Sequence, residues 1–206
     1  MPDVVVGADV IMGADGRSRC RWAATEPETT YHDTEWGFPL TGDNALFERV
    51  CLEGFQSGLS WRTILTKREN FRAAFAGFDI GTVARFGERD VERLLGDAGI
   101  IRHRGKIDAA INNARHAVEL IETHGPLEDY FWRYAPPPGH VPGSMTTSPE
   151  SAALAKDLKK RGWRFVGPTT MFALMQAAGI VNDHAYDCVI RPAAAAAIDE
   201  YAATRM

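Results

Sequence analysis

Cysteine is scarce in this chain of 206 residues, and its three copies are an odd number. So few cysteines argue against a secreted protein held by disulfides and fit a reducing cytoplasm. Long apolar runs are also missing, because no stretch approaches 18 apolar residues, which excludes a membrane-spanning helix and argues against a signal peptide. A basic excess is missing too: the net charge is -4, so any surface for nucleic acid must be local.

Strand-like alternation is absent, whereas helical periodicity runs through most of the chain. Apolar residues make up 45% of the sequence, enough to fill the core of one domain. The pattern predicts an all-α fold, with one helix starting after Ser60 and others at about 44–57, 79–86, 88–97, 104–123, 126–134, 149–161 and 168–179. Residues 1–18 are expected to be a flexible extension, 19–192 the domain, and 193–206 an alanine-rich helical tail.

Two short basic stretches stand out, "GIIRHRGKI" at 99–107 and "KDLKKRGWR" at 156–164. Taken alone, each stretch is more typical of a solvated helix end, where cations suit the helix dipole. The second leads from a helix capped by Ser148 through "GWRFVGP" into another helix, which gives a helix, a glycine-bearing turn and a helix. This arrangement suits a phosphate oxygen, although a plain helical hairpin explains it equally well. The Pro/Gly-rich segment 135–149 before it is either a long connection or a hinge.

A metal site is one interpretation of the cysteines and histidines. His184 and Cys188 are four residues apart, which would place both on one face of a helical turn, and Cys20 and His32 offer two more ligands. Two thiolates and two imidazoles would make a closed, structural zinc site. The alternative is that the four are unrelated. Cys51, among apolar residues, is expected to fill the core.

Glu53 falls at the edge of the apolar arc of a predicted helix, where an ionised carboxylate is costly without a partner or a function. Trp61 follows soon after it, and Tyr31 and Trp36 come from the opening stretch. The sequence therefore favours an aromatic pocket with one acidic acceptor. The alternative is an aromatic core with Glu53 paired to an arginine.

A family resemblance is carried by several of these segments. They are "RCRW", "YHDTEWG", "LFERVCLEGFQSGLSW", "KRENFRAAF", "DAGIIRHRGKI" and "LKKRGWRFVGPTTMFALMQAAGIVNDH", with Cys188 following. Over residues 19–192 the chain resembles bacterial 3-methyladenine-DNA glycosylase type I. The resemblance implies the all-helical helix-hairpin-helix glycosylase architecture, with the hairpin near 162–168 on a DNA phosphate.

The resemblance also implies roles for individual residues. One structural zinc ion per chain is expected on Cys20, His32, His184 and Cys188. The base site is expected on Tyr31 and Trp61 as stacking partners, Trp22 and Trp36 around them, and Glu53 as the hydrogen-bonding, catalytic carboxylate. DNA contacts are expected from Arg164, Gly167, Thr169, Thr170, Arg102 and Arg104. The partner is double-stranded DNA with alkylated adenine, without a membrane, and the protein is expected to be a cytoplasmic monomer.

The implied reaction flips out 3-methyladenine and releases it by hydrolysis, which leaves an abasic site. Thr169 stands where bifunctional relatives carry a Schiff-base lysine, so no strand-cleaving lyase step is expected. Asn182 stands where most of the wider superfamily carries a catalytic aspartate, and Asp183 is one residue out of register, so the general base stays open. Two rivals are a zinc-organised DNA-binding module and a zinc hydrolase.

Overall fold

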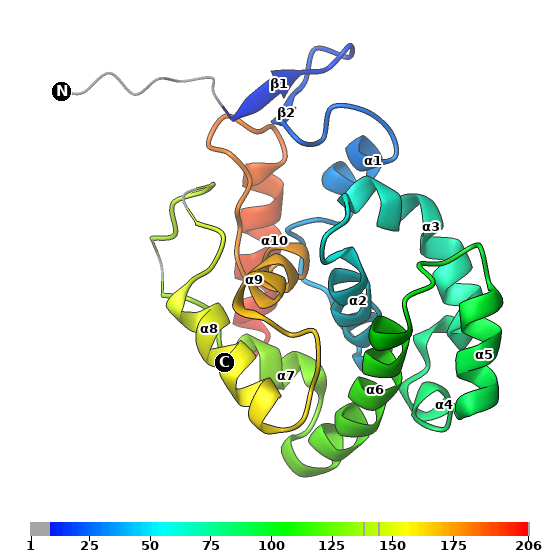
Figure 1. Cartoon of the computed structure of the whole chain (residues 1–206). Helices are drawn as coiled ribbons and strands as arrows, with labels where there is room; N and C mark the ends of the chain where they lie inside the picture. Colours follow the sequence, from blue (N-terminus) through cyan, green and yellow to red (C-terminus); the bar gives the residue numbers. More distant parts are fainter. Residues whose placement is uncertain (1–8, 138, 144, 206) are drawn as a thin grey trace. The chain divides into compact units, whose positions relative to one another are not determined.

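The computed structural model of the chain describes residues 9–137, 139–143 and 145–205 (Figure 1). Its helices are α1 Glu28–Thr34, α2 Asp43–Gln56, α3 Trp61–Ala74, η1 Ala76–Phe78, α4 Ile80–Ala84, α5 Glu88–Gly96, α6 Arg104–His124, α7 Leu127–Trp132, α8 Pro149–Lys160, α9 Pro168–Ala177 and α10 Arg191–Ala203. The prediction of a mostly helical protein is confirmed. Within the described ranges, no helix has the length and apolar character needed to cross a membrane.

Two short strands correct the expectation that strands are absent. Residues Val10–Met12 form β1 and pair antiparallel with β2, residues Ser18–Cys20, so that Val10 lies opposite Cys20. Three-residue strands are too short for alternation to be visible in the sequence. Gly16, with φ +74°, lies in the turn that joins them. Part of the predicted extension is therefore paired, and residues 1–8 lie outside the described range.

The helix starts follow the local signals of the sequence. At α3, the Ser60 side chain accepts a hydrogen bond from the backbone N-H of Thr63 at 3.2 Å. At α8, the Ser148 hydroxyl accepts from Ser151 N-H at 3.1 Å, and Pro149 occupies the first turn. Both serines satisfy N-H groups that the helix itself cannot bond.

The chain divides into two compact units. The first contains residues 1–39, 136–146 and 175–206, and the second contains 40–135 and 147–174. Phenylalanines build much of the core of the second unit. The Phe55 and Phe71 ring centroids are 4.7 Å apart, and those of Phe75 and Phe78 are 5.3 Å apart. These rings are fully buried and join α2, α3 and η1.

The first unit brings together distant parts of the sequence. Its strands β1 and β2 are blue in Figure 1, and its helix α10 is orange to red. Val189, just before α10, donates its backbone N-H to the carbonyl of Ser18 in β2 at 2.9 Å. Gly179, with φ +70°, lies so close to Phe38 that a Cβ atom there would be 2.5 Å from the Phe38 carbonyl carbon. Only glycine fits this approach.

Candidate functional site

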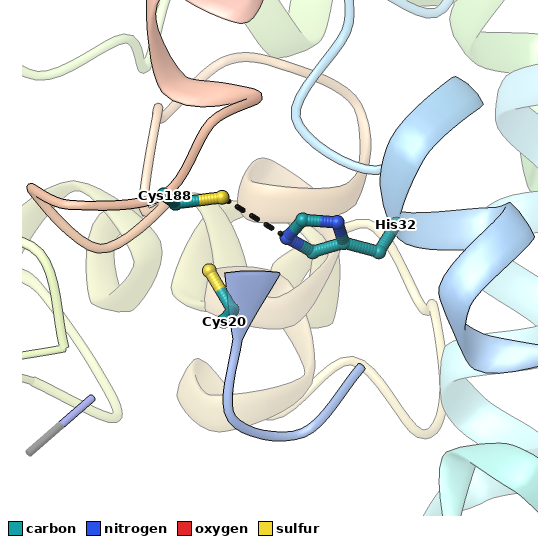
Figure 2. Close-up of side chains that lie close together, drawn as sticks. All are labelled: Cys20, His32 and Cys188. Atoms are coloured by element: carbon teal, nitrogen blue, oxygen red, sulfur yellow. Dashed lines mark hydrogen bonds between the residues drawn. The ribbon is translucent and has the colours of Figure 1, made fainter. Parts of the chain in front are cut away.

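Three of the four predicted metal ligands come together in the first unit. Figure 2 shows the side chains of Cys20, at the end of β2, His32 of α1 and Cys188 pointing toward one another. One ligand atom from each lies within 4.8 Å of the others, and all three residues are buried. The Nε2 atom of His32 is 3.4 Å from the Cys188 sulfur.

His184 lies next to this cluster. It is completely buried, and its ring centroid is 4.9 Å from that of His32. Its Nδ1 atom lies 3.1 Å from the Asn182 side-chain oxygen, whereas its Nε2 atom has no hydrogen-bond partner among the described residues. A buried polar atom without a partner is costly and needs an explanation. A metal ion held with the other three residues would supply one.

The segment from His184 to Cys188 is not the helical turn expected from its spacing. It forms an irregular loop with a turn in which Cys188 N-H donates to the Ala185 carbonyl at 3.0 Å. The Ala185 N-H in turn donates to the Cys20 sulfur at 3.3 Å. The expected helix does not form because hydrogen bonds to neighbouring segments, such as that from Val189 to Ser18, replace those of a helix.

Two residues at the cluster, Cys188 and His184, are in the protonation states that bind a metal. A hydrogen bond from the Cys20 thiol and one from His32 lower the pKa of Cys188 to about 3, although burial opposes them. The neighbouring Cys188 sulfur and burial raise the pKa of Cys20. Burial, and then the charge of His32, lower the pKa of His184 to about 4. A thiolate, as at Cys188, and a neutral imidazole, as at His184, are the forms that bind zinc, whereas Cys20 would have to lose its proton on binding.

Asp33 contacts the ring of His32 on the side away from the cysteines, a role that was not predicted from the sequence. Its Oδ1 atom is 2.8 Å from Nδ1 of His32, which leaves Nε2 of that ring toward the cysteines. Buried Arg19 donates to both oxygens of Asp33, at 3.0 Å from Nε and 2.8 Å from Nη2. Burial raises the pKa of Asp33, but the hydrogen bonds from Arg19 and His32 together lower it by more, so the pKa of Asp33 lies below its usual value. Carboxylates in this position orient metal-binding histidines, and an Asp directly after His32 was the available signal.

Gly37 packs against His184 and gives a test of the cluster's geometry. It has φ +83°, and a Cβ atom added to it would be 2.5 Å from Cε1 of His184. We expect Gly37→Ala to lower the free energy of unfolding by about 3 kcal/mol, from strain and overpacking together. We also expect the cluster to bind a metal more weakly. Urea unfolding and metal titration would measure the two effects.

Gly16 offers the matched control for that substitution. Its φ of +74° is similar, but no atom lies within 4 Å of an added Cβ. Gly16→Ala should therefore cost only the backbone strain, about 1 kcal/mol. Equal losses in the two variants would mean that contact with His184 contributes nothing.

Three predicted base-site aromatics lie beside the cluster in the first unit. The Trp22 ring centroid is 5.1 Å from that of Trp36 and 6.2 Å from that of Tyr31. Trp36 packs edge-on against His184, with centroids 4.6 Å apart. Tyr31 and Trp36 are buried, whereas Trp22 is 37% exposed. The opening stretch of the sequence thus supplies both candidate ligands and aromatic surface.

The other two predicted base-site residues, Glu53 and Trp61, belong to the second unit. Glu53 of α2 is buried, and burial raises its pKa to about 7, against an opposing effect of Arg49. The guanidinium of Arg49 lies over the Trp61 ring, 5.7 Å from the ring centroid. Arg49 therefore acts electrostatically on Glu53, but this effect alone does not establish the arginine pair of the alternative interpretation. The grouping of these two residues with the three aromatics of the first unit stays a prediction.

The predicted hairpin connects α8 to α9 within the second unit. The side chain of buried Asn113, on α6, forms two hydrogen bonds with the backbone of Arg164 in the hairpin. Its amide nitrogen donates to the Arg164 carbonyl at 2.9 Å, and its oxygen accepts the Arg164 N-H at 2.8 Å. Asn112 donates to the Gly162 carbonyl at 2.8 Å. Gly162 has φ +88° and Phe165 has φ +55°. The turn is thus fixed by side chains that the sequence analysis did not single out.

The predicted DNA contacts lie on or near this hairpin. Arg164 and Thr169 are exposed, and Gly167 and Thr170 are half-buried at the start of α9. The other basic stretch is nearby, because the His103 ring meets the Phe165 ring edge-on with centroids 6.4 Å apart. Arg102, which precedes it, is exposed, whereas Arg104 forms an ion pair with Glu88 at 2.9 Å.

Asp183, the open candidate for a general base, is engaged in hydrogen bonds of the first unit. Its Oδ1 atom accepts from Nε2 of His140 at 2.6 Å and from Gly143 N-H at 2.9 Å. Its Oδ2 atom accepts from the Gln176 amide at 2.5 Å. These bonds tie segment 136–146 to the residues before His184. They favour a structural role for Asp183.

Known proteins resemble this chain over most of its length. A family model for methyladenine glycosylase matches residues 22–191. The DNA-3-methyladenine glycosylase 1 of Escherichia coli is 49% identical over 181 residues, which cover 84% of this chain and 97% of that protein. A crystal structure of a 3-methyladenine DNA glycosylase I matches with a TM-score of 0.79 and 48% identity, over 83% of this chain and 98% of that one. The 3-methyladenine DNA glycosylase I of Staphylococcus aureus, solved to explain 3-methyladenine recognition, gives 0.78 and 33%, over 84% and 96%.

Proposed function

Because the chain belongs to the methyladenine glycosylase family, we propose that it excises 3-methyladenine from alkylated double-stranded DNA and leaves an abasic site. The observation that carries the proposal is the buried carboxylate of Glu53, in the same unit as the Trp61 ring. A carboxylate kept out of water is rare without a functional reason. A DNA-binding module without activity would have no use for it.

The chemistry of the lesion explains what such a site must do. Methylation of adenine at N3 leaves the base positively charged and weakens its bond to the sugar, so the departing base is neutral and leaves readily. The base is flipped out of the duplex, stacked between the aromatic rings and read by Glu53 at its polar edge. Bond cleavage gives an oxocarbenium-like sugar, whose charge Glu53 or a DNA phosphate stabilises, and water completes the hydrolysis.

For DNA binding we propose a helix-hairpin-helix role for the turn between α8 and α9. Arg164, Gly167, Thr169 and Thr170 would contact the phosphate backbone, with Arg102 and Arg104 on the neighbouring stretch. Support comes from the fixed backbone of the turn and from the contact between His103 and Phe165. Backbone N-H groups at a helix start bind phosphate without reading sequence. Thr169 offers no amine, so the enzyme is proposed to be monofunctional.

For the metal we propose zinc, held by Cys20, His32, His184 and Cys188. The buried donor set and the orphaned Nε2 atom of His184 fit this ion. Zinc with four protein ligands has no open position, so it would join β2, α1 and the loop before α10 rather than activate water. This closed donor set separates the proposal from a zinc hydrolase. The enzyme is proposed to act as a cytoplasmic monomer.

The test of the function is analysis of the products from methylated duplex DNA. We expect the purified, zinc-loaded protein to release free 3-methyladenine, detected by chromatography, while the strands stay intact until alkali cleaves the abasic sites. Strand breaks without alkali would contradict the monofunctional mechanism. Binding to alkylated DNA without base release would favour the non-enzymatic DNA-binding module instead.

A further inference from the structure

Arg49 is a buried cation that the proposed mechanism does not use. It is 5% exposed and lies on α2, four residues before Glu53, so the two side chains occupy successive turns of one helix face. Its guanidinium is 5.7 Å from the centroid of the Trp61 ring, within the range of a cation-π contact. Arg49 therefore acts on both residues of the second unit that the proposed function assigns to the base site.

We propose that Arg49 is a positioning residue for this site, which stabilises the Glu53 carboxylate before the substrate arrives and supports the Trp61 ring with its guanidinium. The inference rests on the proposed function. It assigns to Arg49 a part in selecting a cationic base over a neutral one, because only an ionised Glu53 attracts a positive charge.

The charge balance explains why an arginine is needed at this position. Burial favours the neutral acid, and it raises the pKa of Glu53 to about 7 even with Arg49 opposing it. Without Arg49, the carboxyl group would be mostly protonated at neutral pH and would lose its attraction for the cation. Arg49 also repels a cationic base, however. Its presence should therefore help binding near neutral pH and hinder it at high pH.

Several other charged groups on or beside α2 are held by partners other than Glu53. On the α3 side, Arg72 forms an ion pair with Glu48 at 2.8 Å. On α6, the Lys106 ammonium donates to the carbonyls of Phe55 and Ser57, at 2.9 and 2.6 Å. On α7, Glu128 accepts the backbone N-H of Gly42 at 2.9 Å, and α4 carries no charged residue. Arg49 is the charged group whose effect on the pKa of Glu53 opposes that of burial.

Two measurements on the zinc-loaded chain test this inference. The first is the NMR titration of the Glu53 carboxyl carbon, assigned with Glu53→Gln, in wild type, Arg49→Met and Arg49→Lys. The second is the binding of 3,9-dimethyladeninium from pH 6 to 9.5. This probe is a permanent cation in which a methyl group replaces the sugar. Thermal unfolding of each variant shows whether it is folded.

The expected result is that the curves of probe affinity against pH for wild type and Arg49→Met cross. In Arg49→Met the Glu53 titration should move upward by about one unit or more, and the probe should bind about fivefold or more weakly at pH 7. At the highest pH, where both proteins carry an ionised Glu53, Arg49→Met should bind as tightly as wild type or more tightly. Arg49→Lys keeps the charge and should titrate close to wild type.

A purely structural role for Arg49 predicts something different. Arg49→Met would then bind the probe more weakly by the same factor at every pH, with an unchanged Glu53 titration, and that result would overturn the inference. Failure of the proposed function looks different again: wild type would release no base from methylated DNA, whereas the NMR titration would still report whether Arg49 controls the carboxylate.

Discussion

Glu53→Gln is expected to lower the single-turnover rate of 3-methyladenine release by about 100-fold or more, the usual size of the loss when one electrostatic group at a reacting centre is removed. Glutamine keeps the shape and a hydrogen-bonding oxygen but cannot carry the negative charge that favours a cationic base and an oxocarbenium-like sugar. The measurement is rapid-quench release from methylated duplex DNA with enzyme in excess. An unchanged rate would remove Glu53 from the mechanism.

The same substitution should not weaken the fold. Because the pKa of folded Glu53 is about 7, above its ordinary value of 4.5, the native state holds an extra proton between these pH values. The stability of the wild type therefore falls as pH rises through this window, by a total on the order of 3 kcal/mol. Glutamine cannot ionise, so Glu53→Gln should be at least as stable as wild type at pH 8.

Glu69→Gln, on a side chain that is 79% exposed, is the control for the rate measurement and should leave the single-turnover rate of 3-methyladenine release unchanged.

Loss of the metal is expected to have the largest effect on stability. We expect one zinc ion per chain by elemental analysis, and Cys188→Ala should lose it. Structural zinc contributes directly to folding, by roughly 10 kcal/mol or more in small zinc-dependent domains. Even a loss of roughly 4 kcal/mol in a chain of this size lowers the melting temperature by about 10 °C. Chelation of the wild type should produce a shift of similar size.

Cys51 provides the control for this experiment. It is a free, buried cysteine on α2, in the second unit and outside the cluster. Cys51→Ala should keep one zinc ion and lose only the modest stability that a smaller core side chain costs, about 1 kcal/mol. Equal zinc content in Cys188→Ala and wild type would exclude Cys188 as a ligand.

Local rules predicted the helices well. Ser60 and Ser148 marked the starts of α3 and α8 because a hydroxyl at this position bonds the free N-H groups of the first turn. The sequence predicts no helix over Glu28–Thr34, because α1 begins without a side-chain cap that would mark its start. The β1–β2 pair was missed because two three-residue strands depend on each other rather than on a pattern within either.

The candidate site could be predicted where it uses residue types that are rare in the chain and suited to metal binding. Cysteine and histidine are few, so Cys20, His32, His184 and Cys188 could be singled out without knowing the fold. The supporting residues could not: Arg19, Asn113 and Lys106 belong to common types, and only the tertiary structure shows that their polar atoms are buried against specific partners. The helical turn predicted for the segment 184–188 was wrong because spacing alone does not determine backbone conformation.

The candidate metal ligands also set an order of events during synthesis. Cys20 and His32 leave the ribosome before α2 to α9, while His184 and Cys188 follow only after these helices have been made. The donor set cannot close on a nascent chain until almost all of the family-matched sequence has emerged. A ribosome that stalls or terminates anywhere in between releases a chain with exposed thiol and imidazole groups and no closed metal site. Completion of the site would thus report that the family-matched segment has been synthesised.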